Sequence, residues 1–124
     1  MKAKGEIVLF INDDILLVPG ACEAHLAAHG SHAKIAVLGR MDWDPAVGIT
    51  PVMRWLEKTG WQFGYDMLTP YREDFIPLHL QHRFTYTIHL SIPTKIARMH
   101  PFREDVTLYG WEDIEWGMRL REDG

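Results

Sequence analysis

The stretch IVLFINDDILLVPG, residues 7–20, decides which fold to expect. Its first part, residues 7–11, is β-branched, aliphatic or aromatic and carries no charge, a pattern typical of a strand covered on both faces in a parallel sheet. Asn12, Asp13 and Asp14 follow at once. Because charged groups are not buried without partners, we expect both carboxylates to lie at the end of this strand, open to solvent or to a cation.

The segments that follow predict an α/β fold. A helix over residues 20–30, closed by Gly30, leads to a second apolar strand over residues 34–39, so a βαβ unit in a sheet flanked by helices is expected. Residues 61–83 lack periodicity and are expected to be irregular, with room for one short strand. The other predicted elements are helices over residues 50–60, 93–99 and 110–123 and a strand over residues 84–92.

Composition limits the classes of function. A length of 124 residues fits one domain, and a net charge of −4 gives no concentrated basic surface for nucleic acid. The single Cys22 excludes an internal disulfide and fits a reducing compartment. We see neither a signal peptide nor an apolar run of the roughly 18 to 20 residues that a membrane span needs, so a cytoplasmic location is expected. Peripheral association with the inner face of the membrane stays open.

The two ends of the chain lead to a further expectation. The first predicted strand begins at Glu6, and the last predicted helix is still running close to residue 124. We therefore expect the chain to be a piece of a larger domain, truncated at both ends.

Asn12, Asp13 and Asp14 form the first candidate site. In open α/β sheets ligands bind at the carboxyl ends of the strands, and hard oxygen ligands placed there suit Mg²⁺ or Mn²⁺. The alternatives are a solvated turn and an N-cap for the helix that follows.

Glu112 and Asp113 form the second candidate site, at the start of the last predicted helix. Adjacent helical residues point in different directions, so one carboxylate can accept a proton while the other binds a hydroxyl group. Trp111, just before them, could stack on a sugar ring or fill the core. The alternative for both acids is capping and compensation of the helix dipole.

Two other patterns have simpler explanations. Cys22, His25, His29 and His32 have a spacing that zinc could use, but exposed helix histidines are the expected account. Trp55, Trp61, Phe63 and Tyr65 could line a carbohydrate platform, although packing in the core is expected.

The order of these motifs resembles the family 2 glycosyltransferases of the GT-A fold, which are inverting nucleotide-sugar transferases. In that family a D-x-D-type metal motif ends a strand and is followed by Y-x-x-N-x-S, F-D-E and G-W-E-D motifs. This chain has INDD, then YTIHLS, PFRE and YGWEDIEWGMRL in the same order. The matching positions are Asn12, Asp14, Tyr86, Ser91, Phe102, Glu104, Gly110, Trp111, Glu112, Asp113, Glu115 and Arg119.

The resemblance implies that residues 1–124 are the central and C-terminal part of a GT-A domain, with a Rossmann-like mixed sheet flanked by helices. It implies Mn²⁺ or Mg²⁺ held by Asp14 and Asn12, a nucleotide-sugar donor, and a carbohydrate or other hydroxyl acceptor. Asp113 would be the general base and Glu112 would orient the acceptor. The remaining substrate-binding positions that it implies are Trp111, Gly110, His89, Ser91 and Asp13.

The sequence departs from the family pattern at three places. Asn12 replaces the first carboxylate, His89 stands at the usual Asn, and Arg103 stands in place of the Asp of F-D-E. The strands that bind the nucleotide base in the family have no counterpart before INDD, so we expect the isolated chain to be inactive.

Two other classes of protein compete with the transferase. One is a non-catalytic piece of a degenerate transferase that binds carbohydrate or a partner, and the other is a zinc hydrolase built on the histidines.

Overall fold

The computed structural model describes residues 2–30, 32–72 and 74–124. The chain forms two compact units, one made of Met1–Gly39 with Leu78–Gly124 and the other of Arg40–Pro77. Helices and a small sheet occur together, which confirms a mixed α/β protein. None of the described helices combines the length and the apolar character needed to cross a membrane.

The sheet of the first unit has three strands in the order β1-β3-β2. These are β1 (Ile7–Ile11), β2 (Val37–Leu38) and β3 (His89–Pro93). Both outer strands pair antiparallel with β3, with Ile7 opposite Pro93 and Val37 opposite Ser91. The prediction of parallel pairing is therefore wrong. The strands β1 and β2 do run in the same direction, but β3 comes from far along the chain and lies between them.

The central strand, β3, is also the most buried of the three. Its residues 89–92 are buried, whereas β1 is only half-buried and its last residue, Ile11, is exposed. The expectation that residues 7–11 are covered on both faces is wrong because β1 is an edge strand. The predicted strand over residues 34–39 is likewise reduced to the two residues of β2.

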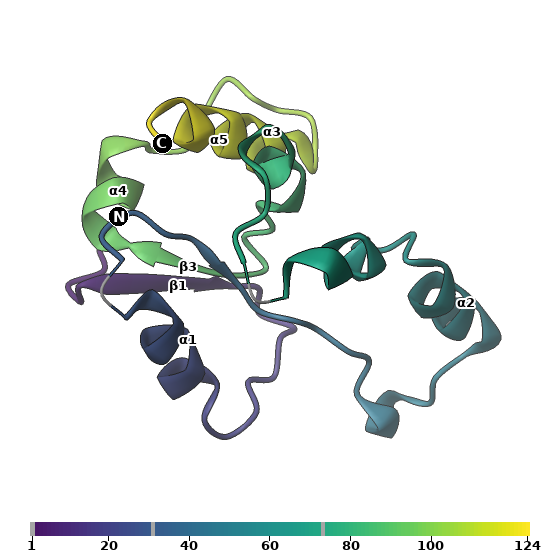
Figure 1. The fold of residues 1–124 in the computed structure, drawn as a ribbon. Coiled ribbons are helices and arrows are strands. Elements are labelled where there is room, and N and C mark those ends of the chain that lie inside the picture. The colour runs from purple at the N-terminus through teal and green to yellow at the C-terminus, as the bar shows by residue number, and fades with distance from the viewer. Residues whose placement is uncertain (1, 31, 73) are drawn as a thin grey trace. The chain divides into compact units, whose positions relative to one another are not determined.

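Helices lie on both sides of this sheet. Helix α1 (Ala21–His29) is on one side, and α4 (Thr94–Met99) and α5 (Trp111–Glu122) are on the other (Figure 1). Side chains alternate along β3, so Leu90 and Ile92 join the apolar core on one face with Ala97 and Trp116. His89 and Ser91 point to the opposite face, where they meet α1.

The predicted strand over residues 84–92 begins later than expected. A short 3₁₀ helix, His82–Phe84, precedes it, and regular pairing begins only at His89. The reason lies in the hydrogen bonds of the intervening residues. The backbone N–H and the hydroxyl of Thr87 both donate to Asp113, so this part of the backbone is used outside the sheet.

In the second unit one predicted helix is confirmed, and the expectation that an aromatic pair packs in the core is wrong. Helix α2 (Pro51–Thr59) begins after Thr50, whose Oγ1 accepts from the N–H of Met53 at 3.2 Å, and it ends at Gly60. The side chains of Trp55 and Trp61 are 51% and 77% exposed, so the expected packing in the core is wrong for them. The other helical elements of this unit are the 3₁₀ helices Pro45–Val47 and Tyr65–Tyr71.

The stretch predicted to be irregular contains helical turns and no strand among its described residues. Helix α3 (Leu78–Gln81) is at its end, and Glu73 lies outside the described residues.

Candidate functional site

The two acidic groups singled out in the sequence meet at one short segment of the first unit. The backbone N–H of Asn12 donates to the carbonyl of Ile88 at 3.4 Å, which fixes the end of β1 to the approach to β3. The adjacent residue, Thr87, donates to both carboxylate oxygens of Asp113, from its backbone N–H at 3.1 Å and from its hydroxyl at 2.6 Å. Segment 87–88 thus ties the turn at residues 12–14 and the start of α5 to the same end of the sheet.

The first acidic group is an exposed turn. The N–H of Ile15 donates to the carbonyl of Asn12 at 3.3 Å, and Asn12, Asp13 and Asp14 are all exposed. The N-cap alternative is wrong, because α1 begins at Ala21 and its N-cap is Gly20. The side chains of Asp13 and Asp14 have no hydrogen bond or ion pair within the described ranges, so their oxygens are open to a ligand.

This turn fits only one kind of metal site. The described residues contain no group of three or more His, Cys, Asp or Glu side chains that could hold a metal ion by themselves. Mg²⁺ commonly takes one or two carboxylates from the protein and completes its shell with water and substrate phosphates. Asp14 and Asn12, with Asp13 beside them, suit that mode of binding and do not suit a closed protein site.

The second acidic group lies in the first turn of α5. This helix starts after Gly110, which has a φ of 81° that favours glycine. Asp113 turns toward Thr87 and does not cap its own helix. Burial raises the pKa of the Asp113 carboxyl, the two hydrogen bonds from Thr87 oppose that rise, and the nearby charge of Glu112 adds to it.

Two aromatic residues that precede Asp113 in the chain are open to solvent. Trp111 is 61% exposed and Tyr109 is 98% exposed, so the alternative that Trp111 fills the core is wrong. The tryptophan in the core is instead Trp116, which has no exposed surface. No hydrogen bond or ion pair holds Glu112 within the part of the chain that the structure describes. Exposed Trp and Tyr side chains combine an apolar ring with a polar group, a combination that is enriched at interfaces.

His89 and Ser91 lie on the other face of the sheet from this group. Ser91 is completely buried and His89 is 8% exposed. The Ser91 hydroxyl is 2.7 Å from Nδ1 of His25 and 2.9 Å from Nε2 of His29. The expectation of exposed helix histidines is therefore wrong for His25 and His29, because both imidazoles face β3 from α1, whereas His32 is exposed as expected. Neither His89 nor Ser91 is therefore open to a substrate, although the family resemblance implies a substrate-binding role for both.

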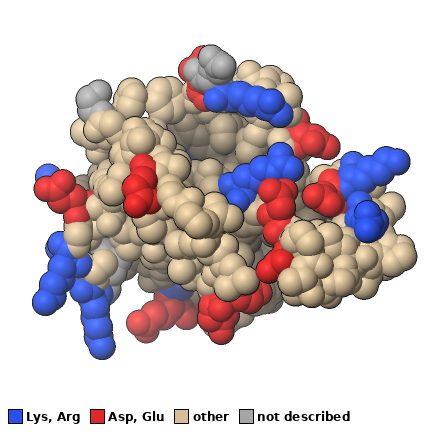
Figure 2. All heavy atoms as spheres, turned by 90° about the horizontal axis from the view of Figure 1, so that it is seen from below, with Lys and Arg blue, Asp and Glu red and all other residues tan. Residues whose placement is uncertain are grey.

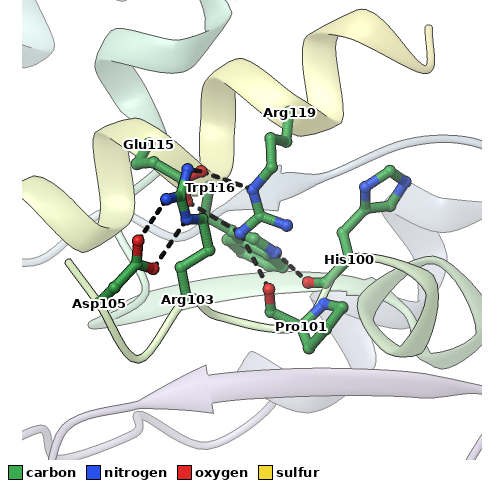
Figure 3. Close-up of polar contacts among 7 residues, drawn as sticks. All are labelled: His100, Pro101, Arg103, Asp105, Glu115, Trp116 and Arg119. Carbon is green, nitrogen blue, oxygen red and sulfur yellow. Dashed lines mark hydrogen bonds and ion pairs between the residues drawn. The ribbon is translucent and has the colours of Figure 1, made fainter.

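An ion-pair network holds the loop before α5 (Figure 3). Arg119 donates to both carboxylate oxygens of Glu115, at 2.7 and 2.9 Å, and also to the carbonyl of Pro101 at 2.9 Å. Arg103 pairs with Asp105 and lies 3.7 Å from Glu115. Glu115 and Arg119 thus hold the loop against α5, and Arg103 belongs to the same network.

No signal in the sequence selects Thr87, although this residue positions Asp113. The two residues are 26 positions apart, and nothing in a strand-like alternation of β-formers marks one threonine as a partner of a distant carboxylate.

Replacing Thr87 by Val tests this contact directly. The variant removes the hydroxyl that donates to Asp113 but keeps the shape and the backbone N–H, so the pKa of the Asp113 carboxyl should rise further above its ordinary value. The titration of the Asp113 carboxyl carbon by NMR measures the shift. Thr107→Val, at an exposed position, is the matched control and should leave this pKa unchanged. An Asp113 pKa that does not change in Thr87→Val would contradict the geometry.

Comparisons of the chain with protein-family models, with curated proteins and with solved structures found no match.

Proposed function

We propose that residues 1–124 carry the metal-binding and acceptor-binding side of an inverting glycosyltransferase similar to family 2 of the GT-A fold. The observation that carries the proposal is that segment 87–88 bonds to the INDD turn through Ile88 and to Asp113 through Thr87. Two acidic groups about a hundred positions apart in the sequence therefore lie at the same end of the sheet. That arrangement allows one group to serve the donor and the other to serve the acceptor.

The INDD turn serves the donor in this proposal. Asp14 and Asn12 would hold Mn²⁺ or Mg²⁺, and Asp13 beside them would contact the donor. The ion, when bound, neutralises the charge that develops on the departing nucleoside diphosphate. The exposure of these side chains and the lack of partners for both carboxylates in the described residues support this role.

The start of α5 serves the acceptor. Asp113 takes the proton from the acceptor hydroxyl. At the same time the hydroxyl oxygen of the acceptor forms a bond to the anomeric carbon of the donor sugar, and the bond from that carbon to the diphosphate oxygen breaks. Its elevated pKa brings the carboxylate closer to the strength that a base working near neutral pH requires. Each oxygen of Asp113 accepts one hydrogen bond from Thr87, so lone pairs remain for the acceptor.

The residues beside Asp113 bind and orient the acceptor. Trp111 presents an exposed ring on which a sugar can stack, and Glu112 is open to accept a hydrogen bond from a second hydroxyl. Gly110, with its positive φ, lets the chain enter α5 at this angle and leaves space before Trp111.

A carbohydrate-binding module without catalysis is the second candidate. The exposed rings of Trp111 and Tyr109 favour it, because they would bind sugar with or without a metal ion. Figure 2 shows that acidic and basic side chains are scattered over the face that it displays. Dependence on Mn²⁺ or Mg²⁺ separates the two candidates, since a transferase of this kind requires the ion and a sugar-binding module does not.

Replacing Asp14 by Ala tests the proposed function. We expect the affinity of the complete polypeptide that carries residues 1–124 for UDP or GDP with Mn²⁺ to fall below detection, while the fold survives. A surface carboxylate without a partner contributes little to stability, within about 0.5 kcal/mol. Calorimetric titration of each nucleotide with and without Mn²⁺ measures the affinity.

Glu122→Ala removes an exposed carboxylate from the far end of α5 and serves as the matched control. Unchanged nucleotide affinity in Asp14→Ala would make residues 12–14 a simple turn. Metal-independent binding of an oligosaccharide by the wild type, without nucleotide binding, would support the second candidate.

A further inference from the structure

Helix α1 is attached to the sheet by imidazole groups and not by an apolar face. Its only buried residues are His25 and His29, and Leu26, its one large apolar side chain, is 58% exposed. The other residues of the helix that could pack are alanines. The contacts of the two histidines with β3 therefore decide whether α1 stays docked.

These contacts form one continuous hydrogen-bonded chain. It runs from Nε2 of His29 to the hydroxyl of Ser91 at 2.9 Å, and from that hydroxyl to Nδ1 of His25 at 2.7 Å. The other ring nitrogen of His25, Nε2, lies 3.2 Å from Nε2 of His89. We call these four residues the histidine chain. At its two ends, Nδ1 of His29 and Nδ1 of His89 are buried and have no hydrogen-bond partner among the described residues.

A count of hydrogens shows how the histidine chain responds to acid. Three neutral imidazoles and one hydroxyl carry four exchangeable hydrogens for three hydrogen bonds, so one hydrogen is always left over. This count holds for every choice of tautomers. Each further proton adds another buried N–H without an acceptor and places a positive charge beside neighbouring imidazoles. Docking of α1 therefore favours the neutral form of the histidine chain.

Among the described residues, no carboxylate is buried beside the histidine chain to compensate such a charge. The side chains of β1 and β2 are all apolar, and the ring of His89 packs so closely on Gly39 that a Cβ there would overlap it. The other titratable groups on and beside α1 are Cys22, Glu23 and His32, all of which are exposed. Lys34, in the segment after them, pairs with Asp123. Burial lowers the pKa of His25 and of His29, and the charges of the other two histidines lower that of His25 further.

We propose that the histidine chain is a pH-sensitive latch that releases α1 from the sheet in mild acid. The direction follows from the proton balance. With α1 released, the imidazoles of His25 and His29 meet water and take up protons below their ordinary pKa of about 6.5. The docked form binds fewer protons, so docking is fully favourable above that pH and weakens as the pH falls through it. For each proton taken up on release, the equilibrium shifts toward release by up to about tenfold per pH unit.

Amide hydrogen exchange at pH 7.5 and pH 5.0 tests the latch in the unmodified chain. Protection factors, which correct for the intrinsic effect of pH on exchange, are compared for α1 and for α5, which packs on the opposite face of the sheet. We expect protection of α1 to fall at least tenfold at the lower pH while that of α5 stays within about threefold. Equal changes in α1 and α5, or no change in α1, would overturn the proposal.

His29→Gln provides the second arm of the test. The amide of Gln can take the place of Nε2 in the contact with Ser91 but cannot titrate, so protection of α1 should depend less steeply on pH. His79→Gln, at an exposed position in α3, is the matched control and should behave as the wild type does. An unchanged pH dependence in folded His29→Gln would exclude this residue from the latch. If the variant does not fold, the hydrogen-exchange result for the unmodified chain decides the test.

Discussion

For the proposed transferase activity, replacing Asp113 by Asn is expected to lower turnover by about 10² to 10⁴, the usual contribution of a positioned general base. The amide keeps the shape of the side chain and can keep both contacts with Thr87, accepting from its backbone N–H and donating to its hydroxyl. It cannot accept a proton from the acceptor. Steady-state kinetics should show a loss in kcat with little change in the KM for the donor, because the base acts on the acceptor in the transition state.

The pH dependence of the same reaction gives an independent check. A base must be ionised to work, so kcat should fall as the pH drops toward the pKa of Asp113, which burial places above the ordinary carboxyl value. The acid limb of this profile should be absent in Asp113→Asn. Asp123→Asn, after the end of α5, is the matched control for loss of one carboxylate. Turnover close to that of the wild type in Asp113→Asn would remove this residue from the catalytic role and make Glu112 the candidate base.

Replacing Trp116 by Ala should have the largest effect on stability, a loss of about 3–5 kcal/mol in the free energy of unfolding. This side chain has no exposed surface, and its ring packs edge-on against Phe10 at 5.4 Å and beside Phe102 at 4.8 Å between ring centres. Its Nε1–H also donates to the carbonyl of His100 at 2.6 Å. The substitution leaves a cavity under the sheet and a carbonyl without its donor, and urea denaturation measures the loss.

Trp111→Ala is the matched control, since the same change is made five positions earlier on the same helix. Trp111 is 61% exposed, so its replacement should change stability by no more than about 0.5 kcal/mol. A similar loss in both variants would mean that the core is not organised around Trp116.

Local signals in the sequence predicted the helices well. Thr50, Pro51 and Gly60 mark both ends of α2, and the cap that they predict is formed by a 3.2 Å hydrogen bond within four residues. Gly30 likewise ends α1. Such signals succeed because the groups that satisfy a helix end lie close to it in the sequence.

The pairing of the sheet could not be predicted in the same way. The run at residues 7–11 has the composition of a strand buried on both faces, but its position at an edge depends on pairing with β3, whose residues lie 78 to 86 positions further along the chain. A strand pattern contains no information about which other strand will pair with it. The alternation over residues 84–92 likewise predicts a longer strand than the structure has, because the hydrogen-bond donors of Thr87 bond to Asp113 and not to a neighbouring strand.

The candidate site shows the same contrast between features that local sequence predicts and features that depend on distant residues. Residue type and spacing were enough to select the turn at residues 12–14 and the pair Glu112 and Asp113. They gave no reason to place His25 and His29 inside the protein, since imidazole is tolerated on an exposed helix as well as in a core. Only the presence of Ser91 and His89 opposite them makes burial favourable, and those partners lie more than sixty positions away.

The strand order β1-β3-β2 determines which parts of the chain can fold during translation. Strand β3 pairs with both of the other strands and is the last of the three to be translated. Strands β1 and β2 therefore have no partner in the sheet until Pro93 has left the ribosome. Residues 40–77 form a compact unit of their own and leave the ribosome before that moment. Because long-range pairing must follow the closure of long loops, residues 40–77 can fold while the nascent sheet is still incomplete.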